Sequence, residues 1–288
     1  MPSTAPARPL SGTRTQVPEP DRLEPVRPRV LLLADSLAYH GPWRPELLTD
    51  ARLFPNVMAR ALDAEPDVVA QVGWTARHAW RSLTRDPRVY SLLVPHADAV
   101  VLAVGGMDYL PTALPTHLRE GIGYLRPRPV RRVVRRTYLA AQPRVARWTR
   151  GRLRAIPQRL TDGYLTNCVT ALRAVRPGVP IIGILPPPHR AAAFGFQLRG
   201  HQPAWEAARA WGIVHGVPMA DLAAMVQPHL DAGRANPDGL HFGWESHRDV
   251  GLELARVLQS CAGWPPRSVQ DERQQSGDGK KHADHAES

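Results

Sequence analysis

Short apolar runs alternate with longer amphipathic stretches through the middle of this chain, and this alternation restricts the possible folds more than any other feature. The runs predicted as strands cover residues 29–34, 67–72, 97–104, 179–185 and 217–220. Because they are apolar almost throughout, we expect both of their faces to be buried, as in a parallel sheet. Predicted helices between them include residues 55–64, 162–175, 203–215 and 244–261. The alternation predicts an α/β protein of three layers (α/β/α) around a parallel sheet.

The two ends of the chain differ in composition from its middle. Residues 1–27 are rich in Pro and polar side chains, and residues 265–288 run into Gln, Asp, Lys and His. Both segments are predicted to be disordered tails. The remaining residues, 28–264, are enough for one domain with one core.

Cysteine usage and hydropathy bear on the cellular compartment. Cys168 and Cys261 are the two cysteines of the 288 residues, too few for a disulfide framework, and neither belongs to a zinc-binding motif. The sequence has no apolar run that resembles a signal peptide or approaches the length of a membrane span. We expect a cytoplasmic protein without a transmembrane segment; oligomeric state is left open.

The chain is strongly basic, with 37 Lys and Arg residues against 26 Asp and Glu and a formal net charge of +11. This excess predicts attraction to anions such as phosphates, carboxylates, nucleic acid or an acidic membrane surface, and composition does not choose among them.

A hydroxyl group stands where the first predicted strand ends, in the sequence Ala34-Asp35-Ser36-Leu37. In parallel sheets ligands bind at the carboxyl ends of the strands, where free backbone N–H groups can polarise an oxyanion. The alternative is an ordinary helix cap.

Glycine turns follow the next two predicted strands. Gly73 precedes Trp74, and Gly105 opens the sequence Gly-Gly-Met-Asp that ends at Asp108. A glycine lets the backbone approach a reacting centre that a side chain would block, although an ordinary β/α turn also uses one.

An acid and a histidine three residues apart precede the last predicted helix, in Asp238-Gly-Leu-His241. The acid can fix the imidazole tautomer while the imidazole takes a proton from a nucleophile. Ser36, Asp238 and His241 are therefore the predicted catalytic residues.

In this order, ADSL, Gly73, GGMD and DGLH resemble the four blocks of the SGNH (GDSL-like) hydrolase family, over about residues 29–262. The resemblance implies an SGNH-type fold and a Ser36 nucleophile with Asp238 and His241. It also implies oxyanion donors from the backbone of Ser36 and Gly73. The family expects an Asn in the third block, where this chain has Met107, and methionine has no N–H to donate.

The runs LLLADSLAYHGP, AVGGMDYLP and PDGLHFGWESHRDVG resemble more narrowly the actinobacterial diglucosylglycerate octanoyltransferases. That resemblance implies transfer of octanoyl from acyl-CoA, through an acyl-serine, to an anionic glucosylglycerate acceptor in methylglucose lipopolysaccharide biosynthesis. It implies no cofactor and no metal. An SGNH esterase or thioesterase remains the alternative.

Residues 126–159, here called the arginine segment, contain twelve Arg, and no acidic residue occurs between Glu120 and Asp162. The segment is expected to be a helical insertion at about residues 115–160. One helix has Val130 and Val133 on its apolar stripe. After Pro143 a second helix is expected, with inward-facing side chains at Val145, Trp148, Leu153 and Ile156.

The arginine segment has several possible uses. Arginine forks suit the phosphates of CoA or the carboxylate of a glycerate, whereas a solvated cationic face is the alternative without a specific role. A nucleic-acid-binding protein would use the same charges, but no known binding motif accompanies them, so no nucleic acid is expected. A membrane-surface esterase would use amphipathic helices to reach lipid.

Further side chains are predicted to contact substrate because they adjoin the motifs, follow a strand or carry the charge of the arginine segment. They are Asp35, Tyr39, His40, Trp74, Met107, Asp108, Arg131, Arg135 and His189.

Overall fold

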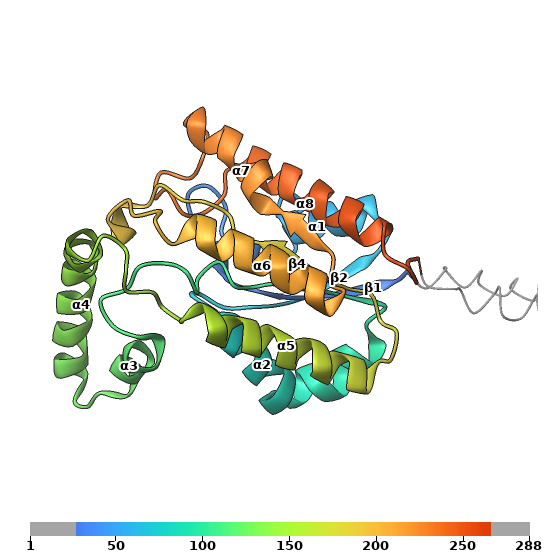
Figure 1. The fold of residues 1–288 in the computed structure, drawn as a ribbon, viewed down its shortest axis with the longest axis horizontal. Helices are drawn as coiled ribbons and strands as arrows, with labels where there is room; N and C mark the ends of the chain where they lie inside the picture. Colours follow the sequence, from blue (N-terminus) through green and yellow to red (C-terminus); the bar gives the residue numbers. More distant parts are fainter. Residues whose placement is uncertain (1–26, 266–288) are drawn as a thin grey trace, which may run out of the picture.

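A computed structural model describes residues 27–265 and contains one sheet of five parallel strands (Figure 1). The strands are β1 (Arg29–Ala34), β2 (Glu65–Ala70), β3 (Ala99–Ala103), β4 (Ile181–Leu185) and β5 (Met219–Asp221), in the order β2-β1-β3-β4-β5. The predicted tails fall almost wholly outside the described residues.

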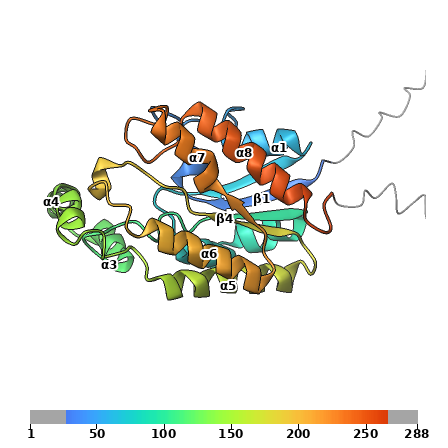
Figure 2. The same ribbon diagram turned by 45° about the horizontal axis from the view of Figure 1, so that its top comes forward.

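Helices cover both faces of the sheet, which confirms the predicted three-layer α/β/α class (Figure 2). They are α1 (Phe54–Ala61), α2 (Ala76–Arg85), α3 (Thr116–Gly121), α4 (Arg128–Trp148), α5 (Gln158–Val175), α6 (His201–His215), α7 (Leu222–Asp231) and α8 (Trp244–Gln259). One core packs α1, α7 and α8 against the sheet, and the other packs α2, α5 and α6. Leu31 and Leu32 on β1 belong to opposite cores, as a strand buried on both faces requires.

β2 begins two residues earlier than the sequence predicts. Its ladder to β1 starts with Glu65 opposite Arg29, and the predicted last strand residue, Val72, is 78% exposed beyond the ladder. The prediction missed the start because Glu65 and Pro66 are not apolar, although their backbone extends the pairing.

Strand order decides which turns meet. β1 pairs with β2 on one side and with β3 on the other, both parallel. The turns after these three strands therefore lie side by side at the carboxyl edge of the sheet, where ligands bind in open α/β sheets.

The insertion between β3 and α5 contains α3 and α4 and lies beyond the carboxyl edge of the sheet (Figure 1). The prediction of a second helix after Pro143 is wrong, because α4 runs unbroken through this proline. Gln142 holds the helix to the body: its amide donates to the Pro111 carbonyl at 2.7 Å and accepts from the Ala113 N–H at 2.7 Å. This anchoring beside Pro143 offsets the helix hydrogen bond that proline cannot make.

Of the residues predicted to face inward on the insertion, Ile156 is buried as predicted, but the prediction is wrong for most of α4. Val133 is 62% exposed and Trp148 is 84% exposed, while the buried residues of α4 are Gln142 and Ala146. Polar anchoring rather than an apolar stripe orients α4. Among residues 27–265, no helix has both the length and the apolar character that a membrane span requires.

Candidate active site

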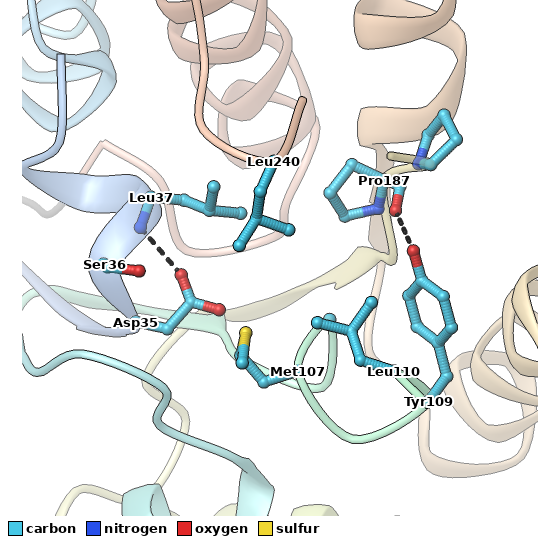
Figure 3. A pocket seen from close by; sticks show the side chains of 10 residues that line it. Asp35, Ser36, Leu37, Met107, Tyr109, Leu110, Pro187 and Leu240 are labelled. Carbon is cyan, nitrogen blue, oxygen red and sulfur yellow. Dashed lines mark hydrogen bonds between the residues drawn. The ribbon is translucent and has the colours of Figure 1, made fainter. Parts of the chain in front are cut away.

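Ser36 follows β1 directly and is 4% exposed, in a short 3-10 turn that it begins. Asp35 caps this turn, since its Oδ1 accepts the Leu37 N–H at 2.9 Å (Figure 3). Burial raises the pKa of Asp35 to about 6, against the lowering effect of that hydrogen bond. The capping role therefore falls to Asp35, and the Ser36 hydroxyl is available for another partner.

That partner is His241, from a loop that lies 205 residues further along the chain. His241 Nε2 lies 3.0 Å from Ser36 Oγ, and its Nδ1 lies 2.6 Å from Asp238 Oδ2. The three side chains form a continuous hydrogen-bonded row in the order that proton transfer from a serine requires.

The Asp238–His241 loop is held by its own backbone. Asp238 Oδ1 accepts the N–H groups of Leu240 and His241 at 2.8 and 3.0 Å. Burial by itself would raise the pKa of Asp238, but the hydrogen bonds from the His241 ring and from these N–H groups outweigh it and hold the pKa below its ordinary value. Asp238 is thereby kept ionised, as a group that stabilises an imidazolium must be.

Asn236 joins this loop to the segment that follows Ser36. Its Oδ1 accepts the Asp238 N–H at 2.9 Å, and its buried Nδ2 donates to the Gly41 carbonyl at 3.1 Å. The sequence does not distinguish Asn236 as a site residue, because an Asn near a turn is common and its partner Gly41 is distant in sequence.

His40 packs on the imidazole of His241, with ring centroids 3.8 Å apart and planes 16° apart. Its carbonyl accepts from His247 Nε2 at 3.1 Å, while His247 Nδ1 accepts the Phe54 N–H at 3.2 Å. Burial lowers the pKa of His247 to about 4, which matches a neutral ring that donates from one nitrogen and accepts at the other. His40, predicted to touch substrate, thus lies against His241, and His247 was not predicted.

The two glycine turns meet beside Ser36. Gly73 has φ +69°, and a methyl group built on it would lie 3.9 Å from Met107 Cε. Met107, which stands where the family has an Asn, is therefore next to Gly73. It places a thioether there in place of the hydrogen-bond donor that the Asn would supply.

Asp108, predicted to contact substrate, bonds to other parts of the chain and does not line the cavity at Ser36. Its carboxylate accepts the Ala76 N–H at 3.1 Å and the Thr161 hydroxyl at 2.9 Å, and so connects the turn after β3 to α2 and α5. Burial raises the pKa of Asp108 to about 7, against those hydrogen bonds.

A small, mainly apolar cavity opens at Ser36 (Figure 3). It is lined by Asp35, Ser36, Leu37, Gly106, Met107, Tyr109, Leu110, Pro187, Pro188 and Leu240. Its far wall is fixed by the Tyr109 hydroxyl, which donates to the Pro187 carbonyl at 2.6 Å. Three of the predicted residues, Asp35, Ser36 and Met107, line this cavity.

The other residues predicted to contact substrate do not line this cavity. Trp74 donates its indole N–H to Gln71 Oε1 at 2.8 Å, and Tyr39 is half-buried in the turn after Ser36. His189 is buried, with the rings of Tyr109 and Phe194 near it. On α4, Arg135 is exposed and Arg131 donates to the Gly123 carbonyl at 3.2 Å. No group of His, Cys, Asp and Glu within residues 27–265 is arranged to hold a metal ion.

Comparison with known proteins places these features in a family. Residues 35–248 match the model of the GDSL-like Lipase/Acylhydrolase family. A diglucosylglycerate octanoyltransferase of Mycolicibacterium hassiacum is 41% identical over 241 residues, which cover 84% of this chain and 98% of that protein. One of the same name from Mycobacterium tuberculosis is 41% identical over 232 residues, covering 81% and 92%.

Solved structures agree on the fold. A lipase/acylhydrolase from Enterococcus faecalis superposes with a TM-score of 0.53 at 17% identity, covering 80% of this chain and 94% of its own. At that identity the likeness supports the fold alone, whereas the family model spans the segment from Asp35 to beyond His241. The chain belongs to the GDSL-like lipase/acylhydrolase family.

Proposed function

We propose that this chain is a serine-dependent O-acyltransferase that moves a medium-chain acyl group, octanoyl, from acyl-CoA to a hydroxyl of a glucosylglycerate. The observation that carries the proposal is the row Ser36–His241–Asp238, with its 3.0 and 2.6 Å contacts. It occurs in a chain 41% identical to two octanoyltransferases over more than four-fifths of its length.

In the first half of the reaction, Ser36 Oγ attacks the thioester carbonyl while His241 Nε2 takes the hydroxyl proton. Asp238 holds the imidazole through Nδ1 and stabilises its charged form. When the tetrahedral intermediate collapses, the C–S bond breaks and the proton on His241 goes to the departing thiolate. An acyl-Ser36 remains.

In the second half, an acceptor hydroxyl attacks acyl-Ser36 and gives its proton to His241 Nε2. The acyl C–O bond to Ser36 breaks, and the proton returns to Ser36 Oγ. Water competes for the same intermediate. Well-oriented groups reach effective molarities of about 10⁵ M or more, which is enough for a bound acceptor to win.

The cavity and the arginine segment supply the two kinds of contact these substrates need. Leu37, Leu110 and Leu240 give the cavity at Ser36 an apolar wall that suits an aliphatic chain. The helix α4, which contains seven Arg, lies beyond the carboxyl edge of the sheet (Figure 1), and its guanidinium groups suit a CoA phosphate or a glycerate carboxylate. A cytoplasmic location, where acyl-CoA is available, belongs to the same proposal.

Product analysis tests the proposal. The protein is given octanoyl-CoA with and without a glucosylglycerate, and free octanoate is compared with acylated sugar. Acylated sugar is expected to dominate at saturating acceptor. If free octanoate dominates under that condition, the chain is an esterase or thioesterase.

A further inference from the structure

The site lacks one of the oxyanion donors that the family resemblance implies, the side-chain amide of the Asn in whose place Met107 stands. Met107 lies beside Gly73 and presents a thioether, which donates no hydrogen bond. The family resemblance implies oxyanion donors from the backbone N–H groups of Ser36 and Gly73, and a tetrahedral intermediate is best stabilised by further donors aimed at its oxygen.

An arginine approaches the same point from the insertion. A methyl group built on Gly73 would lie 3.8 Å from Arg119 Nη2, as close as it would lie to Met107 Cε at 3.9 Å. A guanidinium group therefore borders the glycine turn on the side where the expected amide is missing.

The helix that carries Arg119 is fixed on both sides. Glu120 accepts from Arg77 Nη1 at 3.0 Å and contacts His78 Nε2 at 2.9 Å, so α3 is bound to α2. Thr116 donates its hydroxyl to the Ala155 carbonyl at 2.8 Å at the other end. α3 therefore holds Arg119 at a defined place beside the turn that precedes α2.

Arg119 has no competing partner in the described part of the chain. The adjacent Glu120 is occupied by Arg77, His78 and Arg81, and across residues 27–265 the half-buried guanidinium of Arg119 forms no ion pair and no hydrogen bond. Its charge nevertheless reaches the buried groups nearby: burial raises the pKa of Asp108, and Arg119 opposes that rise. A cation left without a partner at this position is available for a developing negative charge.

We propose that Arg119 is a catalytic residue that donates a hydrogen bond to the oxyanion and takes the place of the amide that Met107 lacks. This inference rests on the proposed acyl transfer at Ser36. As the Ser36 Oγ–carbon bond forms, the carbonyl electron pair moves to oxygen, and Arg119 N–H groups stabilise that charge without giving up a proton. A charged donor forms stronger hydrogen bonds than a neutral amide, which compensates for its longer side chain.

The alternative role for Arg119 is to bind an anionic part of the substrate before reaction. The two roles separate in the kinetics, because an interaction made in the transition state affects kcat, whereas one made equally with bound substrate affects KM. Arg119→Ala and Arg119→Lys are therefore compared with Arg85→Ala, an exposed arginine at the far end of α2.

We expect Arg119→Ala to lower kcat about 10²–10³-fold with KM changed little, as for loss of one oxyanion donor. Arg119→Lys should retain part of the activity, and Arg85→Ala should behave as the unaltered chain. The decisive variant adds Met107→Asn to Arg119→Ala. The new amide should restore kcat at least tenfold. If Arg119→Ala lost activity through misfolding, a new hydrogen-bond donor would not restore it.

Three results would overturn the proposal: an unchanged kcat in Arg119→Ala, a rise in KM alone, or no recovery with Met107→Asn in a protein whose thermal midpoint matches the starting chain. Each of these leaves acyl transfer at Ser36 intact. Activity that survives Ser36→Ala would instead remove the proposed function, so the two failures are distinguishable.

Discussion

At the scale of single residues, the alignment of His241 depends on contacts outside the four motifs. His40 covers one face of its ring, and His247 holds the His40 carbonyl. Asn236 ties the loop of Asp238 to Gly41. These contacts hold His241 Nε2 at 3.0 Å from Ser36 Oγ, so little reorganisation is needed when the hydroxyl proton of Ser36 moves to the imidazole.

Gly239 is the backbone position on which this alignment depends. It has φ +71°, its carbonyl accepts the Arg190 N–H at 2.6 Å, and a Cβ there would collide with the Arg190 carbonyl. Gly239→Ala should displace Asp238 and His241 and lower kcat at least tenfold, measured by steady-state kinetics. Gly233→Ala is the matched control, because Gly233 has φ +68° with open space around it. It should cost about 1 kcal/mol of unfolding free energy and leave kcat unchanged. Equal activity in the two variants would contradict this account of the loop.

The buried Asp108 predicts a pH dependence of stability. Its folded pKa of about 7 lies above the value near 4 of an unfolded Asp. Between these pH values the folded state binds more protons, so the contribution of Asp108 is fully present below pH 4 and is lost as pH rises through 7. The free energy of unfolding of Asp108→Asn, relative to the unaltered chain, should therefore increase by a few kcal/mol between pH 4 and 8 in denaturant titrations. A difference that stays constant with pH would show that Asp108 does not titrate in this way.

At the scale of elements, the sequence predicts best the parts whose contacts are local or uniform. β1 lies where the apolar run predicts it, because burial on both faces leaves no ambiguity in its pattern. Ser36 and the Asp238–His241 pair could be chosen because each stands next to a strand or helix end. The predicted start of β2 is two residues too late, because the pairing of Glu65 with Arg29 can be seen only in the sheet.

The course of α4 and the position of Arg119 depend on contacts between distant segments, which the sequence does not reveal. The continuity of α4 through Pro143 depends on Gln142 bonding to the Pro111–Ala113 loop. The position of Arg119 beside Gly73 depends on Glu120 reaching α2. Neither contact leaves a periodic pattern or a motif, so composition and motif spacing do not predict either of them.

The arginine segment carries a prediction at this scale. α4 contains seven Arg and no acid and lies beyond the strand ends. The double variant Arg131→Gln, Arg135→Gln should raise KM for the charged substrate several-fold, with a smaller effect on kcat and on the thermal midpoint, because these side chains attract an anion and support no core.

The control is Arg85→Gln with Arg88→Gln, two exposed arginines at the carboxyl end of α2 and just beyond it. Both variants remove the same net charge, so a matching rise in KM would assign the effect to total charge and not to α4. Unchanged kinetics in the α4 variant would leave the arginine segment as a solvated cationic face.

At the scale of the whole molecule, the fold gathers the parts of the proposed acyl-transfer site at one edge of the sheet. β1 brings Ser36, β2 and β3 bring the turns of Gly73 and Met107, and the loop before α8 brings His241. The insertion lies over the same edge, whereas the cores on either face of the sheet hold these turns in register. The proposed acyl transfer through Ser36 would use all of these parts.

The most direct test of that claim is intact-protein mass spectrometry after brief exposure to octanoyl-CoA, followed by peptide mapping. We expect a mass increase of one octanoyl group on the peptide that contains Ser36, its absence in Ser36→Ala, and its rapid loss as acylated sugar when a glucosylglycerate is added. An octanoyl adduct that persists in Ser36→Ala, or one that the acceptor does not discharge, would contradict it.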